Sequence, residues 1–156
     1  MSSRRLSLAL LITAIAFITI GCNRNTVFFH YEHTPIAGWE KSDTLRMNIP
    51  PISAEGNYEE RLGLRINGQY PFQSICLIVE QTVFPAGLFH KDTLNIRLTD
   101  QAGNMRGKGI NYFQYDVTFR QLRLQQNDSL HIAIRHNMKR EILPGIADIG
   151  IALQKQ

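Results

Sequence analysis

The sequence predicts an all-β fold: an antiparallel β-sandwich of about eight strands with a jelly-roll or immunoglobulin-like arrangement. Through most of the chain, apolar residues alternate with polar ones in short runs, which is typical of strands that bury one face. Residues that favour turns separate these runs, and no apolar stripe at helical spacing extends beyond about a dozen residues. Two packed sheets would bury the alternating faces against each other.

The expected strands follow one another along the chain. Residues 26–31 are aromatic and β-branched enough for a first strand, and residues 75–79 are continuously apolar, as in a central strand covered on both faces. Alternation predicts the other strands at residues 45–49, 62–66, 94–98, 117–119, 130–134 and 149–153. Turns are predicted at residues 50–51, 67–71, 85–87, 100–104 and 127–128. A short helix, if the chain contains one, would fit best at residues 53–59 or 110–121.

Residues 1–21 have the pattern of an export signal. Arg4 and Arg5 precede an uncharged apolar run over residues 6–20. A helix of about fifteen residues, rising about 1.5 Å per residue, is shorter than a bilayer core of about 30 Å. The run therefore favours a removable signal over a stable membrane-spanning helix.

The signal ends in a sequence that resembles a lipobox, in which a small residue precedes a cysteine. Gly21 and Cys22 fit this pattern, whereas Thr19 stands where a typical lipobox has leucine. We expect cleavage after Gly21 and lipidation of the Cys22 thiol, which would hold the mature chain at a membrane. An aspartate directly after the lipid cysteine would be a signal for retention in the inner membrane. This chain has Asn23 there, and the absence of the aspartate favours the outer membrane. The alternatives are an ordinary export signal and an uncleaved anchor.

The composition limits the size and the partners of the mature protein. Removal of the signal would leave residues 22–156, which suffice for a single domain with its own core. The chain has 17 Lys and Arg against 13 Asp and Glu, and its basic residues are scattered, so we expect no nucleic-acid partner. Once Cys22 is acylated, Cys76 has no cysteine to pair with, and its apolar neighbours predict a packing role.

The candidate catalytic and metal-binding residues form no recognised motif. His30 and Glu32 fall on one face of an expected strand, but further ligands for a metal cannot be named. His131 and Arg135 also share a strand face, which we interpret as solvated. We therefore expect no enzymatic activity, no metal and no cofactor. An envelope hydrolase is a rival hypothesis, and it requires a pocket that gathers two or more of His30, Glu32, His131 and Asp148.

Three aromatic residues are the candidates for an exposed interaction surface. Trp39, Tyr70 and Phe72 lie close to the points where expected strands begin. They could bind a protein or stack on sugar rings, although aromatic residues at such positions also pack in cores and at sheet edges. A surface lipoprotein that binds carbohydrate through a jelly-roll domain is therefore the alternative to a protein-interaction module.

The order of several short motifs indicates a known family. A Phe-rich segment after the lipid cysteine is followed by Trp39, Asp43-Thr44-Leu45, Tyr70-Pro71-Phe72-Gln73-Ser74, Leu77-Ile78-Val79-Glu80, Asp92-Thr93-Leu94, Leu98-Thr99-Asp100, Gly103, Gly107-Lys108-Gly109, Met138 and Leu143-Pro144-Gly145-Ile146-Ala147-Asp148-Ile149-Gly150. Each motif is weak alone. Taken together, with a lipid cysteine in front, their order and spacing resemble the gliding-motility lipoproteins of the GldH type over nearly the whole mature chain.

The resemblance implies a non-enzymatic lipoprotein of the cell envelope that is needed for gliding and is linked genetically to type IX secretion. Its partners would be the membrane, through the lipid on Cys22, and envelope proteins of a motility or secretion complex. The motif near the carboxyl terminus also has a structural interpretation. Pro144 and Gly145 would form a turn, and Asp148 would hydrogen-bond to nearby backbone and direct the last strand.

Overall fold

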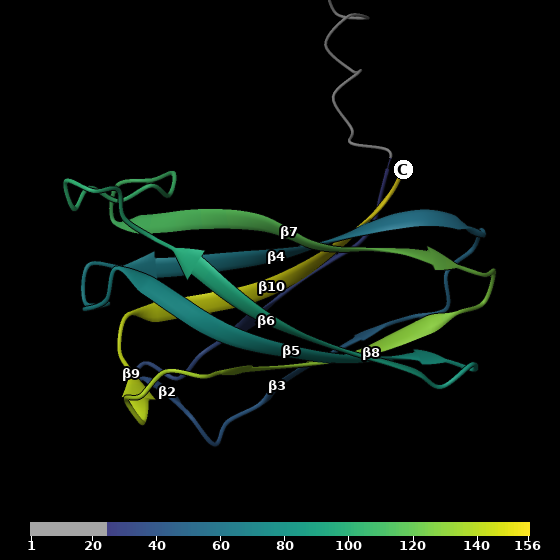
Figure 1. Cartoon of the computed structure of the whole chain (residues 1–156), viewed down its shortest axis with the longest axis horizontal. Coiled ribbons are helices and arrows are strands. Elements are labelled where there is room, and N and C mark those ends of the chain that lie inside the picture. Colours follow the sequence, from purple (N-terminus) through teal and green to yellow (C-terminus); the bar gives the residue numbers. More distant parts are fainter. Residues whose placement is uncertain (1–24) are drawn as a thin grey trace, which may run out of the picture.

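The computed structural model describes residues 25–156, which form ten β-strands (Figure 1). They are β1 Thr26–His33, β2 Trp39–Glu40, β3 Leu45–Ile49, β4 Gly56–Asn67, β5 Ser74–Phe84, β6 Leu88–Arg97, β7 Tyr112–Leu124, β8 Ser129–His136, β9 Ile142–Leu143 and β10 Ile146–Lys155. The signal peptide expected at residues 1–21 and the lipidation expected at Cys22 lie outside the described residues. Within the described part, no helix is long and apolar enough to cross a membrane.

The two segments considered for a short helix are strands instead. Residues 53–59 lead into β4, and residues 110–121 lie mostly in β7, so the helical interpretation of both was wrong. β7 is an edge strand, and many of its side chains are only half-buried, which weakens the alternation in its sequence. Its pairing with β4 over the whole length of both strands overrides that weak local signal.

The eight long strands form two four-stranded antiparallel sheets, which appear as two stacked layers in Figure 1. The first sheet has the order β1-β10-β4-β7, the second has the order β3-β8-β5-β6, and β2 pairs separately with β9. Numbered along the chain without the short pair, the sheets read 1-8-3-6 and 2-7-4-5, which is the arrangement of an eight-stranded jelly roll. The predicted antiparallel β-sandwich is therefore confirmed, and its topology is the jelly roll, not the immunoglobulin-like alternative.

The core lies between the two sheets and is built from the alternating apolar positions. Leu62 of β4 and Ile149 of β10 are fully buried from the first sheet, and they face the second sheet across the interior. The continuously apolar residues 75–79 fall in β5, which is an interior strand between β8 and β6, as predicted. Cys76 within this strand is a free cysteine and is only half-buried.

The sandwich has two ends that matter for the placement of the functional surfaces. At one end, called here the near end, β1 begins beside the end of β10, and the turns at residues 50–55, 85–87 and 125–128 connect the strands. At the opposite end, called the far end, the loops at residues 68–73 and 98–111 lie together with the β2–β9 pair. The near end is on the right of Figure 1, with the carboxyl terminus above it.

Candidate functional site

Two glycines face each other in the middle of the outer surface of the first sheet. Gly150 of β10 pairs with Gly63 of β4, and the same row across the sheet continues to Tyr31 of β1 and Asp116 of β7. The glycines leave the centre of this row without side chains, and the Tyr31 ring packs close to their backbone. A Cβ atom on Gly150 would lie 2.6 Å from the Tyr31 ring, so the ring fits only because residue 150 is glycine.

The Tyr31 ring is held in place by polar contacts from β4 and β7. The side-chain amide of Gln114 donates a hydrogen bond to the Tyr31 hydroxyl, and the Arg65 guanidinium carbon lies 4.5 Å from the ring centroid. Arg65 in turn donates from Nε to Oε1 of Gln114 at 2.8 Å. Burial is the main cause that raises the pKa of the Tyr31 hydroxyl. The position of the Arg65 guanidinium over the ring makes a cation–π contact.

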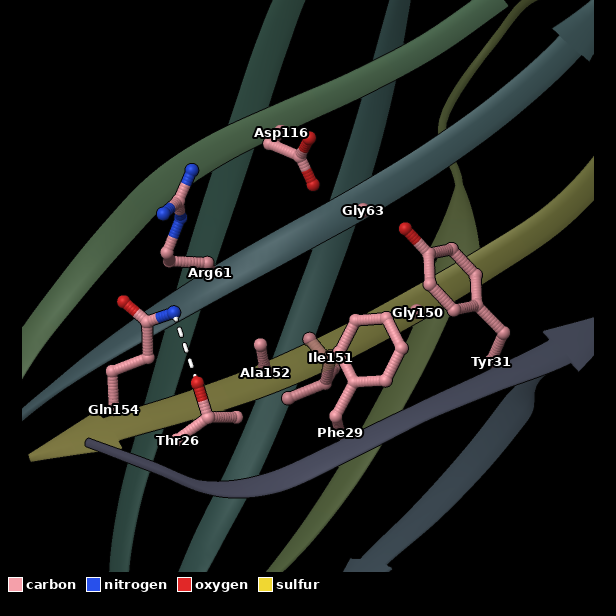
Figure 2. Close-up of a pocket in the computed structure, with 10 residues that line it drawn as sticks. All are labelled: Thr26, Phe29, Tyr31, Arg61, Gly63, Asp116, Gly150, Ile151, Ala152 and Gln154. Carbon is pink, nitrogen blue, oxygen red and sulfur yellow. Dashed lines mark hydrogen bonds between the residues drawn. The ribbon is translucent and has the colours of Figure 1, made fainter. Parts of the chain in front are cut away.

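A groove of about 420 Å³ runs beside Tyr31 along β10 and opens to solvent (Figure 2). Phe29 stands at its side with 63% of its surface exposed, and its ring meets the Tyr31 ring edge to face at a centroid distance of 5.2 Å. Polar side chains complete the lining, with Arg61 and Asp116 on one side and Gln154 at the end toward the start of β1. An exposed aromatic ring beside fixed hydrogen-bonding groups can bind an extended peptide or a sugar.

A second, larger hollow of about 730 Å³ continues along the same sheet toward the far end. Its lining includes the exposed apolar side chains of Ile36 and Tyr112 beside the buried carboxylate of Asp148. Asp148 contacts the His33 imidazole and lies 3.6 Å from the Arg65 guanidinium, so Arg65 stands between the groove and this hollow. Asp148 was expected to hydrogen-bond to backbone, but its partners in the structure are these two side chains.

The aromatic residues proposed from the sequence as an interaction surface are in the interior. Trp39 is fully buried at the far end, where its indole nitrogen donates to the carbonyl of Asp43 and its ring meets His136 edge to face. Tyr70 is 6% exposed, and the half-buried Phe72 packs against it at 5.7 Å. The exposed surface expected from Trp39, Tyr70 and Phe72 is thus corrected, because these rings close the far end of the core.

The residues required by the hydrolase hypothesis do not share a pocket. His30 and Glu32 are hydrogen-bonded at 2.8 Å, but both side chains are exposed on the edge strand β1. Asp148 lies on the opposite face of the same sheet, and His131 belongs to the second sheet, where its ring contacts Phe84. Among residues 25–156, no group of three or more His, Cys, Asp and Glu residues is arranged to hold a metal.

The residues that build the groove were missed in the sequence, although one signal pointed to them. Gly63 and Gly150 each interrupt an apolar strand, and a glycine inside a strand often marks a close approach by another group. Phe29 and Tyr31 are two residues apart, so they share one face of β1. Only the pairing of β1, β10 and β4 reveals that the rings and the glycines belong to the same site.

Comparison with known proteins decides the family. The family model described as GldH lipoprotein matches residues 26–153, which is nearly all of the part that the structure describes. The chain belongs to the GldH lipoprotein family. Among curated proteins, the gliding motility lipoprotein GldH of Flavobacterium johnsoniae is 28% identical over 153 residues, which cover 90% of this chain and 92% of that protein. Membership of this lipoprotein family places the chain at a membrane of the cell envelope.

The GldH-family chain also has distant likenesses among solved structures. A family GH115 4-O-methyl-α-glucuronidase with specificity for decorated arabinogalactans is 11% identical with a TM-score of 0.45, over 86% of this chain and 18% of the enzyme. A family 35 carbohydrate-binding module from Clostridium thermocellum is 11% identical with a TM-score of 0.38, over 80% of this chain and 89% of the module. Likenesses at this level are too distant to guide the assignment of function.

Proposed function

We propose that this chain is a lipid-anchored, non-enzymatic component of a gliding-motility apparatus and that it works together with type IX secretion machinery. In this proposal, residues 1–21 are removed on export, and residues 22–156 form a single domain held at the outer membrane by the lipid on Cys22. The observation that supports it most is the family match over residues 26–153, together with a motility lipoprotein that is similar over 90% of the chain.

The domain would act by binding envelope proteins of a motility or secretion complex. The outer face of the first sheet offers the groove beside Phe29 and the larger hollow beside Ile36, and both are open to solvent. Exposed aromatic and aliphatic side chains next to fixed charges are the usual anchors of a protein interface. Phe29 is the most exposed large apolar side chain of the groove. Its removal should therefore reduce the affinity for a partner more than it reduces the stability of the fold.

Affinity capture from native membranes tests this function. The tag is best inserted between Ala102 and Gly103, in an exposed turn at the far end where an insertion disturbs no strand. We expect the wild-type lipoprotein to recover a defined set of envelope proteins, identified by mass spectrometry. Cys22→Ala should lose membrane association together with those partners, because lipidation needs the thiol.

Two matched variants then ask whether the groove is the binding surface. Phe29→Ala removes the exposed ring beside the groove, whereas Ile110→Ala removes an apolar side chain that is 89% exposed in the far-end loop. We expect Phe29→Ala to deplete partners that Ile110→Ala retains. A membrane-bound wild-type protein that recovers no envelope protein above an untagged control would refute the interaction module.

Carbohydrate binding is the second candidate function, and one observation favours it. Trp39 and Tyr70 are buried and cannot stack on a sugar, but Phe29 presents an exposed ring next to Arg61, Asp116 and Gln154. An exposed aromatic face beside hydrogen-bonding side chains suits the apolar and polar sides of a sugar ring. The outer face of the first sheet is therefore the surface on which a glycan would bind.

A glycan array separates the two candidates. Binding of defined glycans that disappears in Phe29→Ala and persists in Ile110→Ala would support a carbohydrate-binding protein. Binding by wild-type protein that persists in Phe29→Ala would contradict a site in the groove. An array on which the folded wild-type protein binds nothing would leave the protein-interaction module as the better account.

A further inference from the structure

The turn between β5 and β6 exposes an uninterrupted apolar segment. All six residues 84–89 are exposed and uncharged, and they include Phe84, Leu88 and Phe89 with 41%, 57% and 61% of their surfaces exposed. Single exposed apolar residues are common on protein surfaces, but three large ones within one turn are a patch. Within residues 25–156, no other segment covers this patch.

The turn lies at the end of the sandwich where the chain arrives from Cys22. Phe84 pairs with Ser129 at the start of β8, and the adjoining turns at residues 50–55 and 125–128 close the same near end. In the first sheet, this end also holds the start of β1, where Thr26 pairs with Gln154. Figure 1 shows the β5–β6 turn at the right, on the side where the adjacent strands also turn.

The length of chain between Cys22 and β1 restricts how the domain can face the membrane. Only residues 23–25 separate the cysteine from Thr26, and four steps of chain reach at most about 14 Å when fully extended. A lipid on Cys22 would therefore hold the near end close to the bilayer surface, with the far end directed away from it. This step rests on the lipid anchor of the proposed function.

The charges near the turn permit contact with lipid. Glu80, on the strand that leads into the turn, is paired with Lys91 at 2.8 Å and with Arg135 at 3.3 Å, and Asp92 is paired with Arg120. These ion pairs leave no unpaired carboxylate among the acidic residues of β5 and β6 to repel anionic headgroups. Phenylalanine and leucine side chains gain free energy by moving from water into the boundary between headgroups and acyl chains.

We propose that the β5–β6 turn, residues 84–89, inserts into the membrane interface and forms a second contact beside the lipid. This contact fixes the orientation of the domain. The groove beside Phe29 and the hollow beside Ile36 then both face along the membrane surface, and the hollow lies farther from the bilayer. A single lipidated residue would leave the orientation of the domain free, whereas two separate contacts restrict it.

The test uses the full lipoprotein reconstituted in vesicles of phosphatidylethanolamine and phosphatidylglycerol, with or without brominated acyl chains. Leu88→Trp places a fluorophore in the turn, and Ile110→Trp places one at an even more exposed apolar position at the far end. The only native tryptophan, Trp39, is fully buried, and its emission is subtracted by means of the wild-type protein. The same samples are floated on a density gradient to measure anchoring independently.

We expect brominated lipid to reduce the emission of Leu88→Trp and to leave that of Ile110→Trp unchanged. Because both variants carry a new tryptophan, Ile110→Trp also controls for the affinity of tryptophan itself for membranes. Protein that floats with the vesicles but shows equal emission loss at positions 88 and 110, or none, would overturn the insertion of the turn while leaving the anchor intact. Protein that fails to float would overturn both the anchor and the insertion.

Discussion

Replacement of Glu60 by glutamine should make the protein more stable at alkaline pH. Glu60 is fully buried on the inner face of β4, beside the buried side chain of Gln81. Burial raises the pKa of the Glu60 carboxyl from 4.5 to about 7, although Gln81 and the positive charge of Arg120 oppose the rise. Arg120 lies 4.0 Å from Glu60 but binds Asp92 more closely, at 2.6 Å, so it compensates the buried carboxylate only weakly.

The sign and the size of the effect follow from this raised pKa. Between pH 4.5 and about 7 the folded protein keeps a proton on Glu60 that the unfolded chain has lost, so the stability of the wild type falls as the pH rises through this range. At about 1.4 kcal/mol for each pH unit, the free energy of unfolding falls by about 3 kcal/mol between pH 4.5 and pH 7 and stays at this lower level above pH 7. Glutamine has nearly the same shape and no charge, so Glu60→Gln should recover up to about 3 kcal/mol at pH 8 and almost nothing near pH 4.5.

Urea unfolding followed by the fluorescence of the buried Trp39 measures this difference at a series of pH values. Burial lowers the pKa of His136, so this residue removes stability as the pH falls and opposes the trend from Glu60 in the wild type. The contribution of His136 cancels when the wild type is subtracted from the variant. Glu55→Gln, at an exposed position five residues before Glu60, is the matched control. A Glu60→Gln difference that is constant across pH, or a loss of stability at pH 8, would refute the assignment.

Three further predictions follow from the groove and the far end. Gly150→Ala should cost about 1–3 kcal/mol, because its new Cβ would overlap the Tyr31 ring, and urea unfolding should show this cost disappearing in a Tyr31→Ala background. Persistence of the cost would place its cause elsewhere. Gly145→Ala should lower the thermal midpoint, because residue 145 has φ = 79° and its Cβ would overlap the backbone of Tyr70; an unchanged midpoint would contradict this account. Phe29→Ala should change the free energy of unfolding by less than about 0.5 kcal/mol in urea, since its ring is mostly exposed, and a larger loss would show a packing role.

Much of the fold could be predicted because the jelly roll buries one face of most strands. The alternation over residues 62–66 and 149–153 survives in the structure as inward-pointing side chains of β4 and β10. The topology could not be predicted, because alternation says which face of a strand is buried but not which strand lies beside it. β1 pairs with β10 at the opposite end of the chain, and no local pattern specifies such a contact.

The candidate site was harder to predict than the fold, for a physical reason. Large aromatic side chains contribute to a core and to a binding surface in similar ways, so residue type alone does not separate them. Trp39 was considered for the surface and lies in the core, whereas Phe29 was considered only as part of a strand and is exposed. Trp39 belongs to the β2–β9 pair and packs in the core at the far end, whereas Phe29 lies on the exposed outer face of the edge strand β1.

The place of β1 in the first sheet determines how the domain would respond to force. A pull that enters at the start of β1 and leaves through a partner at the far end acts along the length of this strand. β1 is joined to β10 by hydrogen bonds that run across the direction of such a pull. The hydrogen bonds between the two strands would therefore be loaded together, in shear. When a strand is instead peeled from its sheet, the bonds break one after another at lower force. The first strand of the domain is therefore loaded in a mechanically resistant geometry, which would suit the membrane-anchored interaction module proposed above.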